Sequence, residues 1–114
     1  MDREKELLAE AYTAYNPQDV DSLLALVSDY VDWPDGSSRL RGKAAVRVYW
    51  TDQWTRTHTH DRPVAVERRP DGRVAVRINQ IVRSLDGSVL STGSFCHVHR
   101  IEGPHIVRMD VEDA

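Results

Sequence analysis

Residues 74–88 of the chain, VAVRINQIVRSLDGS, decide the fold class, because an alternating strand pattern runs directly into a turn signal. Valine and isoleucine occupy every second position at its start, which is the period of a β-strand that buries one face. The Asp-Gly pair near its end is typical of a tight hairpin turn. A second Asp-Gly pair at residues 69–73 and the EGPH break at residues 102–105 mark further turns. The pattern after Thr57 therefore predicts an antiparallel meander of four strands.

The first half of the chain has a different period. Apolar residues recur there at three- and four-residue steps, as one face of an amphipathic helix requires. We expect helices at residues 2–15, in a short segment capped by Asp19, and at residues 43–54. Their expected buried residues are Leu7, Leu8, Ala11, Tyr12 and Tyr15, then Leu23, Leu24, Leu26 and Val27, then Val46, Trp50 and Trp54. Helices followed by hairpin-connected strands predict an α+β fold, with three N-terminal helices packed on one sheet face.

Size and composition narrow the possible functions. A chain of 114 residues has the length of one domain. A net charge of -3 without a basic stripe argues against a nucleic-acid partner. No apolar run is long enough to span a membrane, and the charged N-terminus lacks the apolar core of a signal peptide, so we expect a cytoplasmic protein. The single cysteine, Cys96, cannot form an internal disulfide and is interpreted as a buried packing residue.

Two H-x-H motifs are candidate metal ligands. His97 and His99, with Glu102 close by, have the spacing of alternate strand residues, which present two imidazoles on one face. His58 and His60 form the second pair. The spacing around His97 loosely resembles a cupin metal motif, but cupins are all-β barrels, and the first half of this chain is helical. The alternative is that both pairs are polar residues of a strand or a connection. We expect no metal and no cofactor. A metal-dependent enzyme that uses these histidines is a separate hypothesis.

Three segments together carry a family resemblance: AYNPQDVDSLLALVSDYVDW, the glycine-led helix LRGKAAVRVYW, and the strands that end in HVHRIEGPHIVRMDVED. Over essentially the whole chain they resemble the SnoaL-like and ketosteroid-isomerase-like members of the nuclear-transport-factor-two-like superfamily. The resemblance implies one bacterial-type SnoaL-like domain at residues 1–114. It also implies a cone-shaped α+β barrel, in which a curved, mainly antiparallel sheet encloses a hydrophobic pocket, and a homodimer formed through the outer sheet face.

The catalytic positions of the ketosteroid isomerases are not retained. Trp33, before Pro34, stands where the family has its general-base aspartate. Ala11 stands where it has a tyrosine, with Tyr15 on the same helical face, and Cys96 stands where it has a protonated aspartate. Steroid isomerisation of that type is therefore not expected.

Polyketide cyclases of the SnoaL type offer another comparison, because their acid/base work is attributed to an aspartate and a histidine on late strands. This chain keeps Asp110 but has Arg108 two residues earlier, and a shared face would lower the pKa of the carboxyl. Asp110 and Tyr15 are the candidate catalytic residues. The alternative for Asp110 is a salt-bridged or solvated strand residue.

The orientation of the late strand follows from where Cys96 is placed. If Cys96 points inward, then Ser94 and Val98 also point inward, and His97 and His99 point outward onto the convex face. A one-residue bulge would reverse every one of these assignments.

Aromatic residues dominate the predicted pocket. The tryptophans either fill the core or form a platform on which a flat ligand stacks, and Trp33 falls where relatives place a functional pocket residue. The expected pocket residues are Trp33, Trp50, Trp54, Cys96 and Met109.

The leading functional hypothesis is a homodimeric domain that binds a hydrophobic small molecule. If it is an enzyme, we expect cofactor-free isomerase, cyclase or hydrolase chemistry. The alternative is a non-catalytic dimerisation or accessory module whose outer sheet face is the working surface.

Overall fold

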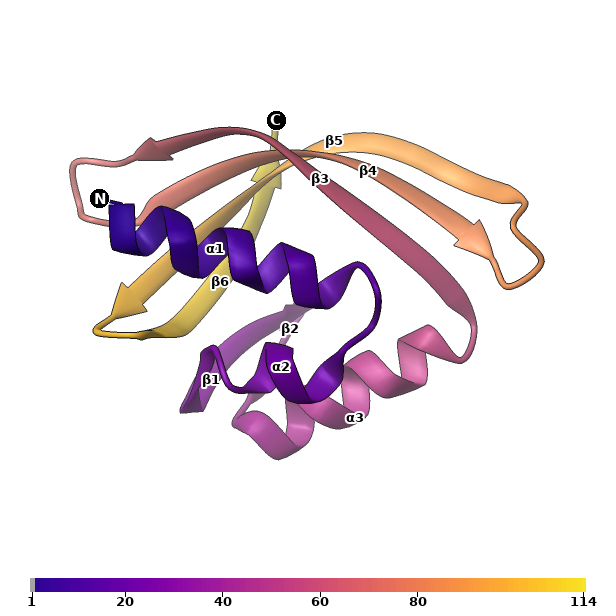
Figure 1. Ribbon diagram of the computed structural model, residues 1–114, viewed down its shortest axis with the longest axis horizontal. Coiled ribbons are helices and arrows are strands. Elements are labelled where there is room, and N and C mark those ends of the chain that lie inside the picture. The colour runs from indigo at the N-terminus through magenta and orange to yellow at the C-terminus, as the bar shows by residue number, and fades with distance from the viewer. Residues whose placement is uncertain (1) are drawn as a thin grey trace.

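The computed structural model describes residues 2–114, and in this part of the chain three helices lie on one face of a six-stranded sheet (Figure 1). The helices are α1 (Asp2–Tyr15), α2 (Val20–Leu24) and α3 (Lys43–Trp54). The strands are β1 (Val27–Asp35), β2 (Ser38–Arg41), β3 (Thr57–Arg68), β4 (Val74–Ser84), β5 (Val89–Glu102) and β6 (His105–Asp113). None of these helices has the length and hydropathy needed to cross a membrane.

The three predicted helices are confirmed. Asp19 caps α2, because its carboxylate accepts a hydrogen bond from the backbone amide of Ser22 at 3.2 Å. The helix ends at Leu24, and Val27 is buried as the first residue of β1 rather than as part of α2. The apolar residues after Asp19 therefore belong first to α2 and then to β1.

The predicted four-strand meander is also confirmed, as β3 to β6, and the β1–β2 hairpin extends it. The strand order is β2-β1-β6-β5-β4-β3, and all neighbours are antiparallel except β1 and β6. Register shifts occur in the β3–β4, β4–β5 and β5–β6 pairs, and such bulges increase the local bend and twist of strands. The sheet is curved and open, as expected for a cone-shaped α+β fold.

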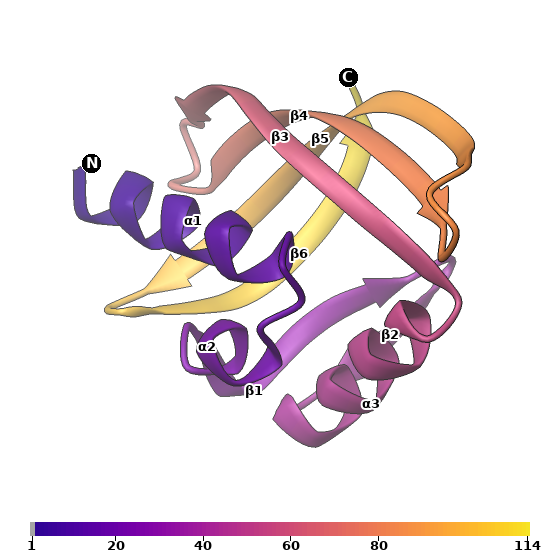
Figure 2. The ribbon, with the colours of Figure 1, turned by 45° about the vertical axis from the view of Figure 1, so that its right-hand side comes forward.

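Helix α3 spans the open side of the sheet. It contacts β1 and β2 at one edge and β3 at the other, while α1 lies across the concave face (Figure 2). Trp50 of α3 is almost completely buried, with its ring edge-on to Trp33 and stacked against Trp54. This aromatic group fixes α3 against the core, since aromatic pairs add to the stability that burial provides.

Gly42 starts α3 with a backbone conformation that only glycine adopts readily. Its φ of 92° and ψ of 156° lie outside the regions open to other residues, and its amide donates to the carbonyl of Val31 at 2.8 Å. A Cβ at this position would meet no atom closer than 3.6 Å, so the constraint is conformational rather than steric crowding.

We therefore predict that Gly42→Ala lowers the free energy of unfolding by about 1–3 kcal/mol. Gly36→Asn is the matched control, because φ at Gly36 is 58°, in the left-handed region that asparagine tolerates. Urea unfolding of both variants measures the difference. Equal stability of the two variants would contradict the role given to Gly42.

Candidate functional site

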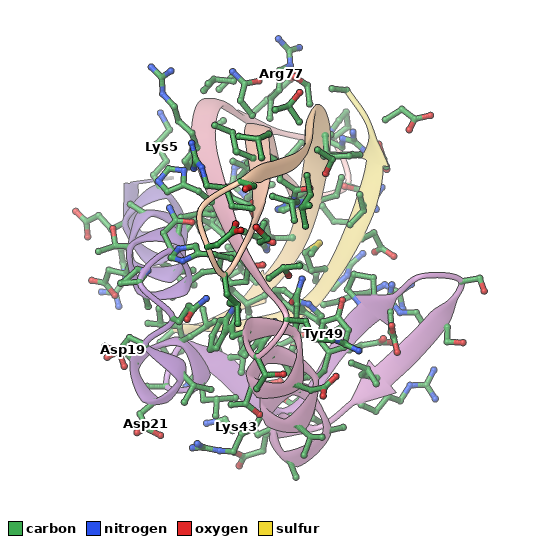
Figure 3. All side chains as sticks on the ribbon, turned by 90° about the vertical axis from the view of Figure 1, so that its right-hand side faces the viewer. Lys5, Asp19, Asp21, Lys43, Tyr49 and Arg77 are labelled. Atoms are coloured by element: carbon green, nitrogen blue, oxygen red, sulfur yellow. The ribbon has the colours of Figure 1, made fainter. Side chains whose placement is uncertain are left out.

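A cavity of about 610 Å³ lies between the helices and the concave face of the sheet. Its volume falls in the range of small-molecule sites, roughly 300–1,000 Å³. Tyr49, labelled in Figure 3, projects from α3 on the side of the β1–β2 hairpin and forms part of the wall. The other aromatic lining residues are Tyr12, Tyr15, Trp33 and Trp50, and the polar ones include Asp61, Gln80, His97 and His99. The cavity thus combines an aromatic wall with polar and charged side chains, including Arg39, Arg108 and Asp110.

The residues expected at the pocket divide into two groups. Tyr15, Trp33, Trp50 and Met109 line the cavity. Trp54 lies behind this wall, stacked on Trp50 with ring centroids 6.4 Å apart. The structure thus brings most of the expected aromatic residues to one chamber.

Cys96 lies on the other face of the sheet. It pairs with Arg77, which points away from the helices in Figure 3, and its Sγ is 4.0 Å from an Nη atom of Arg69. The expectation that Cys96 points into the pocket is therefore wrong, and Ser94, two residues earlier, is exposed.

The expectation that His97 and His99 point outward is also wrong, because these residues alternate with Cys96 along β5. His97 is opposite Val76 and His99 is opposite Val74, two core residues of the concave face. Both imidazoles are buried, with 8% and 2% of their surface exposed. The two histidines therefore belong to the cavity, where sequence analysis did not place them.

A bulge in the β4–β5 hairpin causes this reversal. Near the turn Arg83 pairs with Val89, but the next residue, Val82, pairs with Ser91, so Leu90 is an extra residue. If Leu90 instead paired with Val82, every later pair would be shifted by one residue, and Cys96 would lie opposite the inward-facing Val76. A one-residue shift moves every side chain of a strand to the other face.

Tyr12 joins the two histidines into a buried cluster. Its hydroxyl lies 2.9 Å from Nδ1 of His97 and 3.2 Å from Nε2 of His99. Burial lowers the pKa of His97 to about 4 and that of His99 to about 3, and burial also raises the pKa of Tyr12. All three side chains are therefore neutral at pH 7. We refer to Tyr12, His97 and His99 as the tyrosine–histidine cluster.

Asp61, in β3, is a second polar group that sequence analysis did not place in the pocket. Only 4% of its surface is exposed, and Gln80 donates a hydrogen bond to its Oδ1 at 3.0 Å. Burial raises the pKa of the Asp61 carboxyl, and this hydrogen bond offsets part of the increase. The side chain of Asn16 binds both the amide and the carbonyl of Asp61, at 2.9 Å each, and so fixes its backbone.

The alternation in residues 57–61, THTHD, indicates that Asp61 is buried. His58 and His60 are exposed on one face of β3, and alternation then sends Thr59 and Asp61 to the buried face.

Asp110 stands at the edge of the cavity in an ion-pair network. Arg108 approaches its carboxylate at 2.8 Å, and Arg39 does so at 3.1 Å. Both arginines also bind Asp32, at 3.0 Å and 2.7 Å. The hydrogen bonds from Arg108 hold the pKa of Asp110 below its usual range, so the condition stated for a lowered pKa, that Arg108 shares a face with Asp110, is met.

The two H-x-H motifs do not form a joint site. Strand β4 separates β3 from β5, and His58 bonds to the carbonyl of Asn16 on the exposed side. Within residues 2–114, no group of three or more histidine, cysteine, aspartate or glutamate residues is arranged to hold a metal ion.

Solved structures share this fold at low sequence identity. A protein of unknown function from Burkholderia pseudomallei, described as nuclear-transport-factor-two-like, matches with a TM-score of 0.84 and 22% identity over 100% of this chain and 92% of its own. A proposed polyketide cyclase from Sinorhizobium meliloti matches with a TM-score of 0.81 and 17% identity over 94% of each chain. An LEH-like epoxide hydrolase from M. tuberculosis matches with a TM-score of 0.83 and 15% identity over 97% of this chain and 82% of its own.

Sequence comparison gives the family directly. A search of curated proteins found no significant match. The model of the SnoaL-like domain matches residues 8–109, which is most of the chain. The chain therefore belongs to the SnoaL-like domain family.

Proposed function

We propose that the cavity binds an uncharged, largely apolar small molecule and that Asp61 transfers a proton to or from it without a cofactor. The observation that carries this proposal is a carboxylate buried in the cavity wall with one side-chain hydrogen bond, from Gln80. A buried carboxyl with a raised pKa that faces a cleft is a frequent arrangement for acid–base catalysis.

The shape and composition of the cavity support a flat ligand. Trp33, Tyr49 and Trp50 supply aromatic surface on which a planar molecule can stack, and the volume of about 610 Å³ leaves room for two or more fused rings. The names of two structural neighbours, a proposed polyketide cyclase and an epoxide hydrolase, are consistent with chemistry on small organic molecules.

Asp61 suits proton transfer better than the two residues expected from sequence. Asp110 is neutralised by two arginines and has a lowered pKa, which makes its carboxylate a weak base. Burial raises the pKa of Tyr15, so its hydroxyl keeps its proton and can only donate or accept hydrogen bonds. We therefore assign the acid–base role to Asp61 and propose that Tyr15 acts as a wall residue.

An association module without a ligand is the second candidate, and the cavity argues against it. A domain that acts only through its outer sheet face needs no chamber of this size lined by buried polar groups, since each such group costs stability. A homodimer through the outer face is compatible with either function.

We predict that the protein accelerates exchange of the acidic C–H protons of β-tetralone with D₂O, and that Asp61→Asn abolishes this acceleration while the ketone still binds. The probe is a planar bicycle with a carbonyl beside acidic C–H groups, and asparagine keeps the shape of aspartate but cannot accept the proton. NMR of the ketone measures exchange, and native mass spectrometry measures binding.

Asp110→Asn is the matched control and should keep the exchange activity. Asp61→Asn should also unfold at an equal or higher temperature near pH 7. The folded carboxyl has a raised pKa, so its contribution to stability declines as the pH rises through its titration, and asparagine has no charge to bury. Activity that survives Asp61→Asn but not Asp110→Asn would reverse the assignment.

The neutral histidines predict a pH effect on stability. The unfolded chain protonates His97 below about pH 6.5, whereas the folded chain does so only near pH 4, so the free energy of unfolding falls as the pH falls through this window. His97→Gln should reduce the slope by up to about 1.4 kcal/mol per pH unit. Urea unfolding between these pH values tests this, with the exposed His60→Gln as control. An unchanged slope in His97→Gln would show that the imidazole is not buried as described.

A further inference from the structure

Among the described residues, one nitrogen of the tyrosine–histidine cluster is both enclosed and without a hydrogen-bond partner. Nδ1 of His99 is completely enclosed and makes no hydrogen bond with any described residue. A neutral imidazole has one N–H donor and one acceptor nitrogen, so this atom is either a bare lone pair or a bare N–H. Buried N–H groups without an acceptor are the rarer of the two, and the lone pair is the less costly state.

This choice fixes the direction of every hydrogen bond in the cluster. With Nδ1 of His99 unprotonated, its proton is on Nε2, which donates to the hydroxyl oxygen of Tyr12 at 3.2 Å. Tyr12 then donates its single hydrogen to Nδ1 of His97 at 2.9 Å. The remaining proton of His97 must therefore be on its Nε2.

Nε2 of His97 is the end of this chain of hydrogen bonds. Among the described residues it has no hydrogen-bond partner, and it is not one of the enclosed atoms, while His97 itself lines the cavity. We propose that His97 Nε2–H is a fixed, neutral hydrogen-bond donor to a carbonyl oxygen of the ligand, and that Tyr12 is the positioning residue that sets its direction. The carbonyl part of this proposal rests on the proposed function.

The charges around the cavity favour a neutral ligand group over an anionic one at His97. The lining arginines, Arg39 and Arg108, are each bound to both Asp32 and Asp110. No unpaired cation is therefore available in the described lining for a carboxylate or phosphate. A ketone beside an acidic C–H fits both polar elements, because His97 can hold the oxygen while Asp61 takes the proton and the electron pair moves onto that oxygen.

The tautomers can be measured without any ligand. In long-range ¹H–¹⁵N spectra of the full chain at pH 7, we expect both His97 and His99 to be protonated at Nε2. Tyr12→Phe should shift the Nδ1 resonance of His97 to the position of a lone pair without a hydrogen bond, and a structural role alone would leave that resonance in place. Protonation of His97 at Nδ1 in the wild-type chain would overturn the proposal.

Ligand binding tests the carbonyl contact. β-Tetralone and tetralin share one bicyclic skeleton and differ in the carbonyl, so we expect the ketone to bind about three- to tenfold more tightly, as one neutral hydrogen bond provides. His97→Phe should bring this ratio close to one, and the exposed control His60→Gln should preserve it. Equal affinities in the wild-type chain would overturn the donor role. If neither probe binds, the proposed function and the carbonyl contact fail together, whereas the tautomer spectra decide the direction of the cluster independently.

Discussion

The β-bulge at Leu90 is the constraint on which the site depends. It sets the register of β5 against β4, and thereby turns His97 and His99 toward the helices and Cys96 away from them. A regular hairpin in which Leu90 paired with Val82 would exchange the two faces of the strand and would place the Cys96 thiol, rather than an imidazole, on the face toward the helices. The position of one extra residue near an exposed turn therefore determines the chemistry of a cavity several residues away.

The cavity carries polar groups that a core built for stability alone would lack. Asp61, the two histidines and Tyr12 are all withdrawn from water, and their shifted pKa values record the cost of burying charge there. Each group is held by a specific partner: Gln80 and Asn16 for Asp61, and Tyr12 for both imidazoles. Preorganised groups of this kind keep their geometry when a ligand replaces solvent, which favours catalysis over simple packing.

Local sequence patterns determine much of the fold but little of the site. The helical period of residues 2–15 and 43–54 and the alternation in β4 predict their elements correctly, because each depends on burying one face. The parallel pairing of β1 with β6 joins segments far apart in the chain, and no local pattern encodes it. The face occupied by His97 could not be predicted either, because a bulge changes the register of a strand without a marked change in sequence. Asp61 could have been found from the alternation in THTHD, whereas its pairing with Gln80 requires the sheet.

The pKa of Asp61 is the first quantity to measure, because the proposed function requires a carboxyl whose environment resists ionisation. A ¹³C NMR titration of the folded chain, with Asp61→Asn to assign the resonance, measures it without knowledge of any substrate. We predict a midpoint above the ordinary aspartate value of about 3.9. A midpoint at or below that value would show that Asp61 is a solvated carboxylate and would contradict its role as the acid–base group of the cavity.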